Sequence, residues 1–467
     1  MGIRFHKIRS NFLSFLKEIL IITNTFDTIN FFLRGKKKHS KSDFFSRQKN
    51  YKSLLKKISK SSNNEKIKIF IAVYDYSIWQ VNSLFLSLLK NEKFDVGLVY
   101  IPFLKHYDDE FIVRYKKTLK FCKSKSENVI EVYDFENKKW KTENKFKSFE
   151  IDILIYTHTS NSPFEASSTG KYLLPFYIPY GIMAASNKSF FKAFKFENFQ
   201  FNKNEHNFMF RNLLETDLHL KLKEKYSKIK SINSVVCGYP KLDDYYKIDS
   251  MTDPWKSNSK RFKKKIIWAP HFTISKILEK NKRETLRTSA VFSTFDLNMN
   301  FFLKYFSLNK DILFCYKPHP LLHKTIVETG FLSEDDFNSY LKKLLNLENV
   351  FEYDSPDYIN LFSFSDALIT DCVSFLSEYL PSKKPILFLE NQFYSFNNYG
   401  KKLTENFYKS KGSNFYNIKF FIEEVVVMEN DLMFKKRMET LKEIDLIRNE
   451  PSSKRIINYI NELLYVS

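Results

Sequence analysis

The sequence is poor in glycine and in cysteine. Nine of its 467 residues are glycine, and none lies in the G-x-G-x-x-G turn of a dinucleotide-binding fold or in the glycine-rich loop of a P-loop nucleotidase. The four cysteines stand far apart and form no C-x-x-C pair, which disfavours a disulfide framework or a zinc site. We therefore predict no metal and no cofactor, and a reducing, cytoplasmic compartment.

A long, uninterrupted apolar run is also missing. The best candidate, residues 12–33, contains Lys17, Glu18 and Asp27 and is too polar for a membrane-spanning helix. Its apolar residues recur at helical spacing before the basic run 34–38, and no small-residue cleavage site follows. We predict an amphipathic helix lying on the inner face of the cell membrane. The alternative is a helix that packs on the protein's own core.

The positive charge of the chain is concentrated at its start. Residues 1–60 hold 15 Lys and Arg against three acids, a net charge of +12 out of +22 for the whole chain. Such a segment suits an anionic surface, either acidic lipid or nucleic acid. Aromatic and basic residues do not interleave in a nucleic-acid-binding motif, so we predict no nucleic-acid partner. A non-catalytic binding protein remains the alternative to an enzyme.

The middle of the chain alternates apolar runs with helical patterns. We expect strands at 66–73, 95–101, 129–133 and 152–156, a helical stretch at about 207–230, and further strands at 234–237, 265–269, 312–316, 367–370 and 385–389. This order predicts an α/β fold with two Rossmann-like domains and a cleft between them, the GT-B type of transferase architecture. The expected boundaries are a basic segment at 1–64, domains at 65–230 and 231–429, and helices at 430–467.

Two loops of the second half carry the strongest functional signal. Lys317-Pro318-His319-Pro320 follows the apolar run 312–316, and Asp371 follows the run 367–370. Open α/β sheets bind ligands at the carboxyl ends of their strands, so these loops suit a phosphorylated ligand such as a nucleotide diphosphate. Lys317 and His319 alternate on an extended loop and are expected to face one side. His319 is interpreted as a phosphate ligand or as a histidine that packs the loop.

Other polar residues follow the same strand ends. Thr370, Asp371 and Ser374 lie where a strand meets a helix, which suits phosphate binding or an ordinary helix cap. Glu378 follows one turn later and is expected either to bind a ribose or glycerol hydroxyl or to be solvated. His271, with Thr273 nearby, follows the strand 265–269 as a candidate phosphate or base contact; the alternative for His271 is a surface histidine.

Five motifs in order resemble the CDP-glycerol glycerophosphotransferase family of teichoic-acid and capsule polymer synthesis. They are Gly238/Pro240/Lys241/Asp243, Ala269-Pro270, Lys317-Pro318-His319-Pro320, Ile369-Thr370-Asp371 with Ser374, and Lys384-Pro385-Ile386. The resemblance covers about residues 175–400 and implies substrate binding by Gly181 and Lys241 as well. The family's His-Gly pair is here Tyr180-Gly181, so the histidine position holds a tyrosine, and the family's Tyr-Ser after the aspartate is here Cys372-Val373.

The resemblance implies attack of an acceptor hydroxyl on the glycerol-linked phosphorus of CDP-glycerol, or of another CDP-polyol, with release of CMP. The acceptor would be a cell-surface polymer or a lipid-linked molecule. Candidate bases are His158, Tyr180 and Asp75, of which His158 is preferred because a free tyrosine titrates near pH 10. With His319 on the phosphate, His158 and Tyr180 complete the predicted catalytic set. The alternative enzyme is a GT-B glycosyltransferase that uses a sugar nucleotide in capsule or lipopolysaccharide synthesis.

Overall fold

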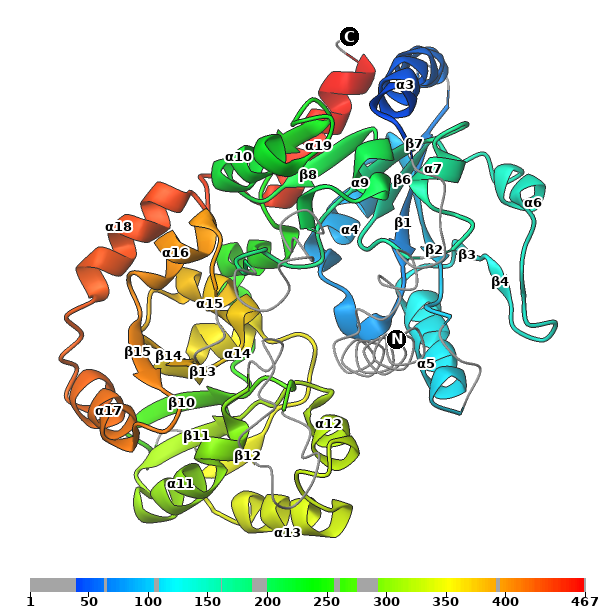
Figure 1. Cartoon of the computed structure of the whole chain (residues 1–467). Coiled ribbons are helices and arrows are strands. Elements are labelled where there is room, and N and C mark those ends of the chain that lie inside the picture. The colour runs from blue at the N-terminus through cyan, green and yellow to red at the C-terminus, as the bar shows by residue number, and fades with distance from the viewer. Residues whose placement is uncertain are drawn as a thin grey trace, which may run out of the picture. The chain divides into compact units, whose positions relative to one another are not determined.

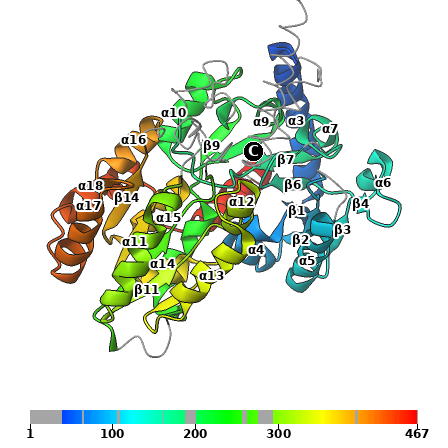
Figure 2. The same ribbon diagram turned by 60° about the horizontal axis from the view of Figure 1, so that its bottom comes forward.

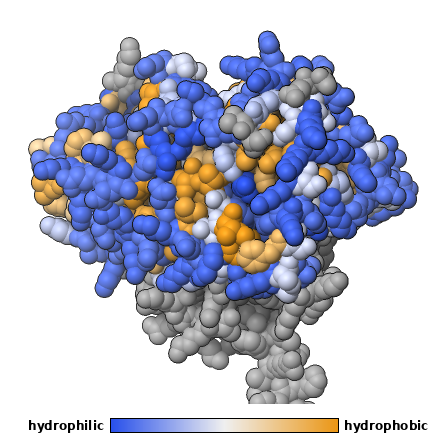
Figure 3. All heavy atoms as spheres, turned by 90° about the horizontal axis from the view of Figure 1, so that it is seen from above, coloured by the Kyte–Doolittle hydropathy of each residue, from blue (hydrophilic) through white to orange (hydrophobic). Residues whose placement is uncertain are grey.

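The computed structural model describes residues 39–62, 65–104, 109–160, 162–186, 200–255, 261–274, 293–391 and 395–465. The amphipathic helix expected at 12–33 lies outside these residues. Within them, no helix combines the length and the apolar character needed to cross a membrane. The face seen in Figure 3 is mainly hydrophilic, with smaller groups of hydrophobic side chains.

The chain folds into two compact units, and each is built from separate parts of the sequence. Unit 1 contains residues 248–443 and a short stretch that begins at 184, whereas unit 2 contains 36–183, 196–247 and 444–467. These units differ from the expected boundaries at 231 and 430. Residues 231–247 and the end of the chain belong with the first half of the sequence, and the helix at 434–443 belongs with unit 1.

Unit 2 is built on a seven-stranded parallel sheet in the order β3-β2-β1-β6-β7-β8-β9. Its strands are β1 (Ile67–Val73), β2 (Phe94–Tyr100), β3 (Val129–Glu131), β6 (Ile153–Tyr156), β7 (Leu174–Tyr177), β8 (Arg211–Leu214) and β9 (Ser234–Val236), and a small hairpin pairs β4 (Tyr133–Asp134) with β5 (Lys139–Trp140). Its helices are α3 (Lys41–Ser61), η1 (Tyr76–Ile78), α4 (Asn82–Leu89), α5 (Asp109–Lys125), α6 (Glu143–Lys147), α7 (Ala166–Thr169), α9 (Asn204–Phe208), α10 (Asp217–Tyr226), most of η2 (Pro240–Ser250) and α19 (Ser452–Tyr465).

Strand β1 shows why this sheet is covered on both faces. Its side chains alternate between two hydrophobic cores, because successive residues of a strand point to opposite faces. Ile69 and Ile71 belong to the core that includes residues of α4, α5 and α19, whereas Phe70 and Ala72 belong to the core that includes Phe146 of α6. Figures 1 and 2 show helices on both faces of the sheet.

Unit 1 is built on a six-stranded parallel sheet in the order β12-β11-β10-β13-β14-β15. Its strands are β10 (Lys264–Ala269), β11 (Ile312–Tyr316), β12 (Val350–Glu352), β13 (Ala367–Thr370), β14 (Ile386–Glu390) and β15 (Tyr408–Lys411). Its helices are α11 (Phe295–Leu308), α12 (Leu322–Glu328), α13 (Glu334–Leu345), α14 (Ile359–Phe364), α15 (Val373–Tyr379), η4 (Leu380–Ser382), α16 (Asn398–Thr404), α17 (Phe415–Phe420), η5 (Phe421–Val427) and α18 (Phe434–Ile444). Buried Trp268 packs against Phe295 and Phe302 of α11 at the centre of the core.

One predicted element has the wrong type of secondary structure. The stretch 207–230, expected to be helical, contains the strand β8 before α10 begins. The strand is only four residues long, and Asn212 and the buried Leu213 and Leu214 are also compatible with a helical pattern. Its pairing with β7 and β9, which depends on distant residues, decides the conformation.

Candidate functional site

Three neighbouring strands of unit 1 end at one edge of the sheet. β11, β10 and β13 are adjacent and parallel, so the loops after Tyr316, Ala269 and Thr370 meet there. The ring of His319 lies 4.3 Å from that of Phe272 and 5.6 Å from that of His271. The structure therefore brings together residues of the predicted loops at the edge where open α/β sheets bind ligands.

His271 and His319 are each held within their own loop through the same ring nitrogen, Nδ1. The Nδ1 atom of His319 accepts a hydrogen bond from the Leu321 backbone N–H (3.1 Å), and that of His271 accepts one from Thr273 (3.3 Å). Burial, with the nearby charge of Lys317, lowers the pKa of His319 to about 4, and burial also holds the pKa of His271 well below its usual range. Both rings are therefore neutral at pH 7 and carry their proton on Nε2, where it is a hydrogen-bond donor.

Asp371 fastens these loops to each other. Its Oδ1 accepts from the backbone N–H of His271 (2.5 Å), while Oδ2 accepts from both the backbone N–H and the hydroxyl of Thr294 (2.5 and 2.9 Å). The side chain is 1% exposed, and burial raises its pKa to about 6. The hydrogen bonds from His271 and Thr294 lower this pKa, but their effect is smaller than that of burial. Asp371 thus holds the start of α11 and the His271 loop in place, and does not cap its own helix α15.

Three residues expected to bind substrate are buried and hydrogen-bonded within unit 1. The fully buried hydroxyl of Thr370 donates to the Ala269 carbonyl (2.6 Å), and Glu378, 3% exposed, accepts from the hydroxyl of Tyr358 (2.5 Å). Lys317, 5% exposed, donates to the Ser355 carbonyl (3.0 Å) and lies 4.7 Å from the centre of the Tyr358 ring. Direct contact of these residues with substrate stays a prediction; in this structure their polar groups bind neighbouring loops.

Two further predicted residues have mainly local contacts. Thr273, 3% exposed, is within 2.9 Å of Nδ1 of His271 through its hydroxyl and so helps to orient that ring. Ser374, in the first turn of α15, is half-buried and lies 3.2 Å from the sulfur of Cys372. Among the predicted residues after β13, Ser374 is the one whose side chain still lies near the surface.

Unit 2 brings its predicted catalytic residues together at the ends of β6 and β7. The rings of His158 and Tyr180 lie 5.5 Å apart, and His158 also contacts the rings of Phe103 (4.9 Å) and Tyr74 (5.7 Å). Tyr180 is 47% exposed, and a side chain added at Gly181 would meet open space. The Tyr180 side chain is therefore accessible, and there is space for a further side chain at buried Gly181.

The electrostatics of this pair make His158 a weak base. Burial and the charge of nearby Lys203 lower its pKa to about 3, and its Nδ1 lies 2.6 Å from the Thr159 carbonyl. A carbonyl only accepts, so Nδ1 carries the proton and Nε2 has the lone pair. Asp75 is already occupied, since its carboxylate accepts from Arg114 (2.7 and 3.0 Å) and from Ser77 (2.6 and 2.9 Å).

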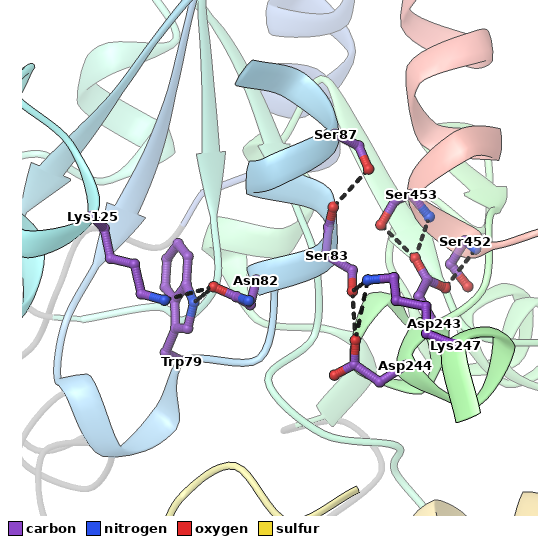
Figure 4. Close-up of polar contacts among 10 residues, drawn as sticks. All are labelled: Trp79, Asn82, Ser83, Ser87, Lys125, Asp243, Asp244, Lys247, Ser452 and Ser453. Carbon is purple, nitrogen blue, oxygen red and sulfur yellow. Dashed lines mark hydrogen bonds and ion pairs between the residues drawn. The ribbon is translucent and has the colours of Figure 1, made fainter. Parts of the chain in front are cut away.

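The Gly238-x-Pro-Lys-x-Asp243 motif organises the end of the chain, and it lies in unit 2. Asp243 accepts from the backbone N–H groups of Ser452 (2.7 Å) and Ser453 (2.8 Å) and from the Ser453 hydroxyl, at the start of α19 (Figure 4). Gly238 has φ = +90°, and a Cβ there would lie 2.3 Å from the Ser452 hydroxyl oxygen. Half-buried Lys241 lies between Gly238 and Asp243 in the motif.

Comparison with known proteins settles the family. The model of the family described as CDP-Glycerol:Poly(glycerophosphate) glycerophosphotransferase matches residues 192–462, more than half of the chain. The chain belongs to this family. The resemblance seen in the five motifs is thereby confirmed, and the chain is an enzyme of the glycerophosphotransferase type.

Solved structures confirm the α/β, GT-B-like fold of this glycerophosphotransferase. The wall teichoic acid polymerase TagF is 13% identical with a TM-score of 0.53, over 91% of this chain and 98% of that chain. A UDP-N-acetylglucosamine 2-epimerase is 13% identical with a TM-score of 0.53, over 85% of this chain and 96% of that chain. The UDP-GlcNAc 2-epimerase from Neisseria meningitidis bound to UDP-GlcNAc is 12% identical with a TM-score of 0.51, over 85% of this chain and 100% of that chain. Such identities show the fold alone. No curated protein matches the chain significantly.

Sequence reasoning missed a set of buried ionisable residues in unit 2. Near the ends of β7 and β8, His206 stacks on Tyr177 (4.6 Å), and Lys203 donates to the Thr159 hydroxyl (3.0 Å). Burial lowers the pKa of Lys203 to about 8. These residues lie in none of the five motifs, and their burial, which sets their chemistry, is a property of the folded unit.

Proposed function

We propose that this glycerophosphotransferase moves glycerol phosphate, or a related polyol phosphate, from a CDP-activated donor to a hydroxyl of a cell-surface polymer or lipid-linked acceptor. The acceptor oxygen forms a bond to the glycerol-linked phosphorus, the bond from that phosphorus to the oxygen of CMP breaks, and CMP leaves with the electron pair. The hydroxyl proton passes to a base or to water. Family membership supports the CDP-glycerol donor, and a variant of the similar polymerase TagF has been soaked with CDPG.

The paired histidines of unit 1 are the observation that carries this proposal. Two neutral imidazoles with Nε2–H donors, at the carboxyl edge of a parallel sheet, suit the oxygens of a diphosphate. Phosphoryl transfer needs mainly positioning and stabilisation of charge on the phosphate oxygens. Weak bases in unit 2 are compatible with this chemistry, because a loose transition state requires little proton removal.

The test is nucleotide release from CDP-glycerol, CDP-ribitol and a panel of UDP-, GDP- and CMP-sugars, with membranes as acceptor. We expect CMP release from a CDP-polyol, reduced about 100-fold or more by His319→Ala. His323→Ala is the matched control, since that nearby histidine is half-buried and hydrogen-bonded to Glu334 through its Nε2 (2.9 Å). Release from a sugar nucleotide alone would contradict the proposal and make the enzyme a glycosyltransferase.

We also propose that the enzyme works on the inner face of the cell membrane, as a peripheral protein in wall or capsule polymer synthesis. Besides the charge of residues 1–60, the outer face of α3 supports this site of action. Three residues of α3 face the core, Phe44, Tyr51 and Ile58, and six of its lysines are exposed: Lys41, Lys49, Lys52, Lys56, Lys57 and Lys60. Exposed lysines near an anionic bilayer contribute about 1 kcal/mol each.

Sedimentation with vesicles tests the membrane proposal. We expect the full chain to bind vesicles of phosphatidylglycerol and phosphatidylcholine but not phosphatidylcholine alone, and to lose affinity when Lys49, Lys52 and Lys56 become Gln. A control with Lys435 and Lys436, exposed on α18, changed to Gln should bind as wild type. Equal loss in both variants would show that net charge, and not α3, directs binding.

A further inference from the structure

We propose that Tyr239 and His219 are positioning residues that hold the backbone of the Tyr180–Met183 loop in its working conformation. The proposal rests on the proposed function and on the substrate contact that the family resemblance implies for Gly181 in this loop. It concerns residues that do not themselves reach the reacting atoms. Both belong to unit 2, as does the loop.

The loop is held through its carbonyl groups. The hydroxyl of Tyr239 donates to the Tyr180 carbonyl at 2.8 Å, and Nε2 of His219 lies 3.2 Å from the Met183 carbonyl. A carbonyl accepts only, so His219 carries its proton on Nε2, and its Nδ1 accepts from the Thr216 hydroxyl at 2.8 Å. One donor thus holds the loop at Tyr180 and a second holds it three residues later.

Side-chain packing fixes Ile182, which is 3% exposed, but does less to fix the first two residues of the loop, Tyr180 and Gly181. Tyr180 is 47% exposed, and nothing lies within 4 Å of a Cβ placed on Gly181. By contrast, Tyr239 is 1% exposed and His219 is fully buried. Buried donors therefore orient a loop whose first residue, Tyr180, is exposed, which is the arrangement by which supporting residues hold a site in productive geometry.

Tyr239 is itself fixed at both sides by the motif that contains it. Before it, the backbone N–H groups of Cys237 and Gly238 both donate to the Leu214 carbonyl (3.0 and 3.1 Å). After it, Asp243 holds the first residues of α19, as Figure 4 shows. The motif Gly238–Asp243 consequently links the C-terminal helix to the Tyr180 loop, and this gives the motif a role other than contact with substrate.

Tyr239→Phe is the direct test, with Tyr340→Phe as matched control. Tyr340 is also a buried tyrosine (6% exposed) whose hydroxyl donates to a backbone carbonyl, that of Met299 at 3.0 Å, but it lies in unit 1. Each change removes one hydroxyl donor from a backbone carbonyl. We expect hydrogen exchange of residues 178–183 to accelerate in Tyr239→Phe alone.

Kinetics give the second readout. We expect Tyr239→Phe to lower kcat for CMP release by about 10- to 100-fold with little change in KM for the donor, because a small displacement of a positioning loop costs rate more than binding. His219→Leu should act in the same way. His219→Gln, whose amide N–H reaches a similar position to Nε2, should recover much of the lost rate.

Wild-type exchange and wild-type kcat in Tyr239→Phe would overturn the proposal, as would equal effects in Tyr340→Phe. Failure of the proposed function is distinguishable. If the wild-type enzyme released no nucleotide from any donor, the exchange of residues 178–183 would still decide whether Tyr239 and His219 hold the loop.

Discussion

At the scale of single residues, two buried charges of unit 2 have no hydrogen-bond partner in the part of the chain that the structure describes. They are Nζ of Lys223 and Oε1 of Glu215, and each side chain is 1% exposed. Burial lowers the pKa of Lys223 to about 7 and raises that of Glu215 to about 8. The charged form of each group is therefore costly in the folded protein, so both affect stability in a way that depends on pH.

Lys223→Met should stabilise the protein at neutral and acid pH. The unfolded lysine keeps its proton up to about pH 10.4. The folded one loses it near pH 7, so wild type suffers the full penalty below pH 7 and less as pH rises. We expect a gain of about 1–3 kcal/mol in the free energy of unfolding at pH 6, shrinking towards pH 9. Urea unfolding at both pH values measures it, and a gain that is the same at pH 6 and 9 would contradict the assignment.

Glu215→Gln should show the opposite dependence. The folded carboxyl keeps its proton up to about pH 8, whereas the unfolded one loses it near pH 4.5, so the folded state binds more protons between these values. Wild type therefore loses stability as pH rises through this window, and the neutral amide does not. We expect the variant to match wild type at pH 4.5 and to exceed it by a few kcal/mol at pH 8. If the free energy of unfolding of the two proteins changed with pH in the same way, the assignment of the raised pKa to Glu215 would be wrong.

Single residues also show which features of the site could be predicted from the sequence and which could not. The strand-end loops correctly located His271 and His319 beside each other, because a short apolar run followed by prolines defines where a strand ends. The same motifs contain Lys317 and Thr370, which are buried in the structure, as is Glu378 one turn after Ser374. A motif shows that a position is constrained. Whether the fold or a ligand imposes the constraint depends on burial, which depends on distant residues.

At the scale of elements, the turn before η2 shows a glycine required by both conformation and space. Gly238 has φ = +90°, where residues with a Cβ are strained, and its Cβ would meet Ser452 and Arg455 of the α19 segment. Gly181, in the loop after β7, faces open space instead. The two glycines thus make a matched pair in one unit.

Gly238→Ala should destabilise unit 2 by about 2 kcal/mol or more, since strain and overlap with the α19 segment add. Gly181→Ala should change the free energy of unfolding by less than about 0.5 kcal/mol. Thermal unfolding compares the two. A loss of donor turnover in Gly181→Ala with unchanged Tm would indicate that substrate approaches this glycine closely, whereas a lowered Tm would show that the loop itself needs the glycine.

Most elements could be predicted from the sequence, because strands such as β1 and β11 are short continuous apolar runs between polar breaks. The exceptions are strands whose identity depends on their neighbours. β7 and β8 have four residues each and gain their conformation from pairing with each other and with β6 and β9. Local pattern alone does not reveal such pairing.

At the scale of the whole molecule, α19 belongs to the same unit as α3 and β1, although the residues of unit 1 lie between them in the sequence. α19 packs against α3 and α4, and Ile456, Ile460 and Leu464 lie in the same core as β1 (Figure 1). Sequence patterns predicted the helix but not this destination, since its contacts with Asp243 span more than 200 residues. The proposed linkage of α19 to the Tyr180 loop follows from this path of the chain.

Ile460→Ala should therefore weaken the unit that holds β1 and spare the unit that holds β10. Ile460 is fully buried, so the loss should be about 2–4 kcal/mol. Native-state hydrogen exchange reports each unit separately, and we expect reduced protection in peptides of β1 and β2 alone. Leu432→Ala, at an 88% exposed position of unit 1, is the control and should leave both units unchanged. Equal loss of protection in β10 would show that the two units unfold together.

The position of α19 in the sequence also determines the order in which the two units can complete their folding during synthesis. Domains generally fold as units while the chain leaves the ribosome, with earlier segments folding first. Unit 1 has its whole sheet available once β15 has emerged, but the core of unit 2 lacks Ile456, Ile460 and Leu464 until α19 has been translated. The core that contains β1 is therefore completed only after the whole sheet of unit 1 has been made.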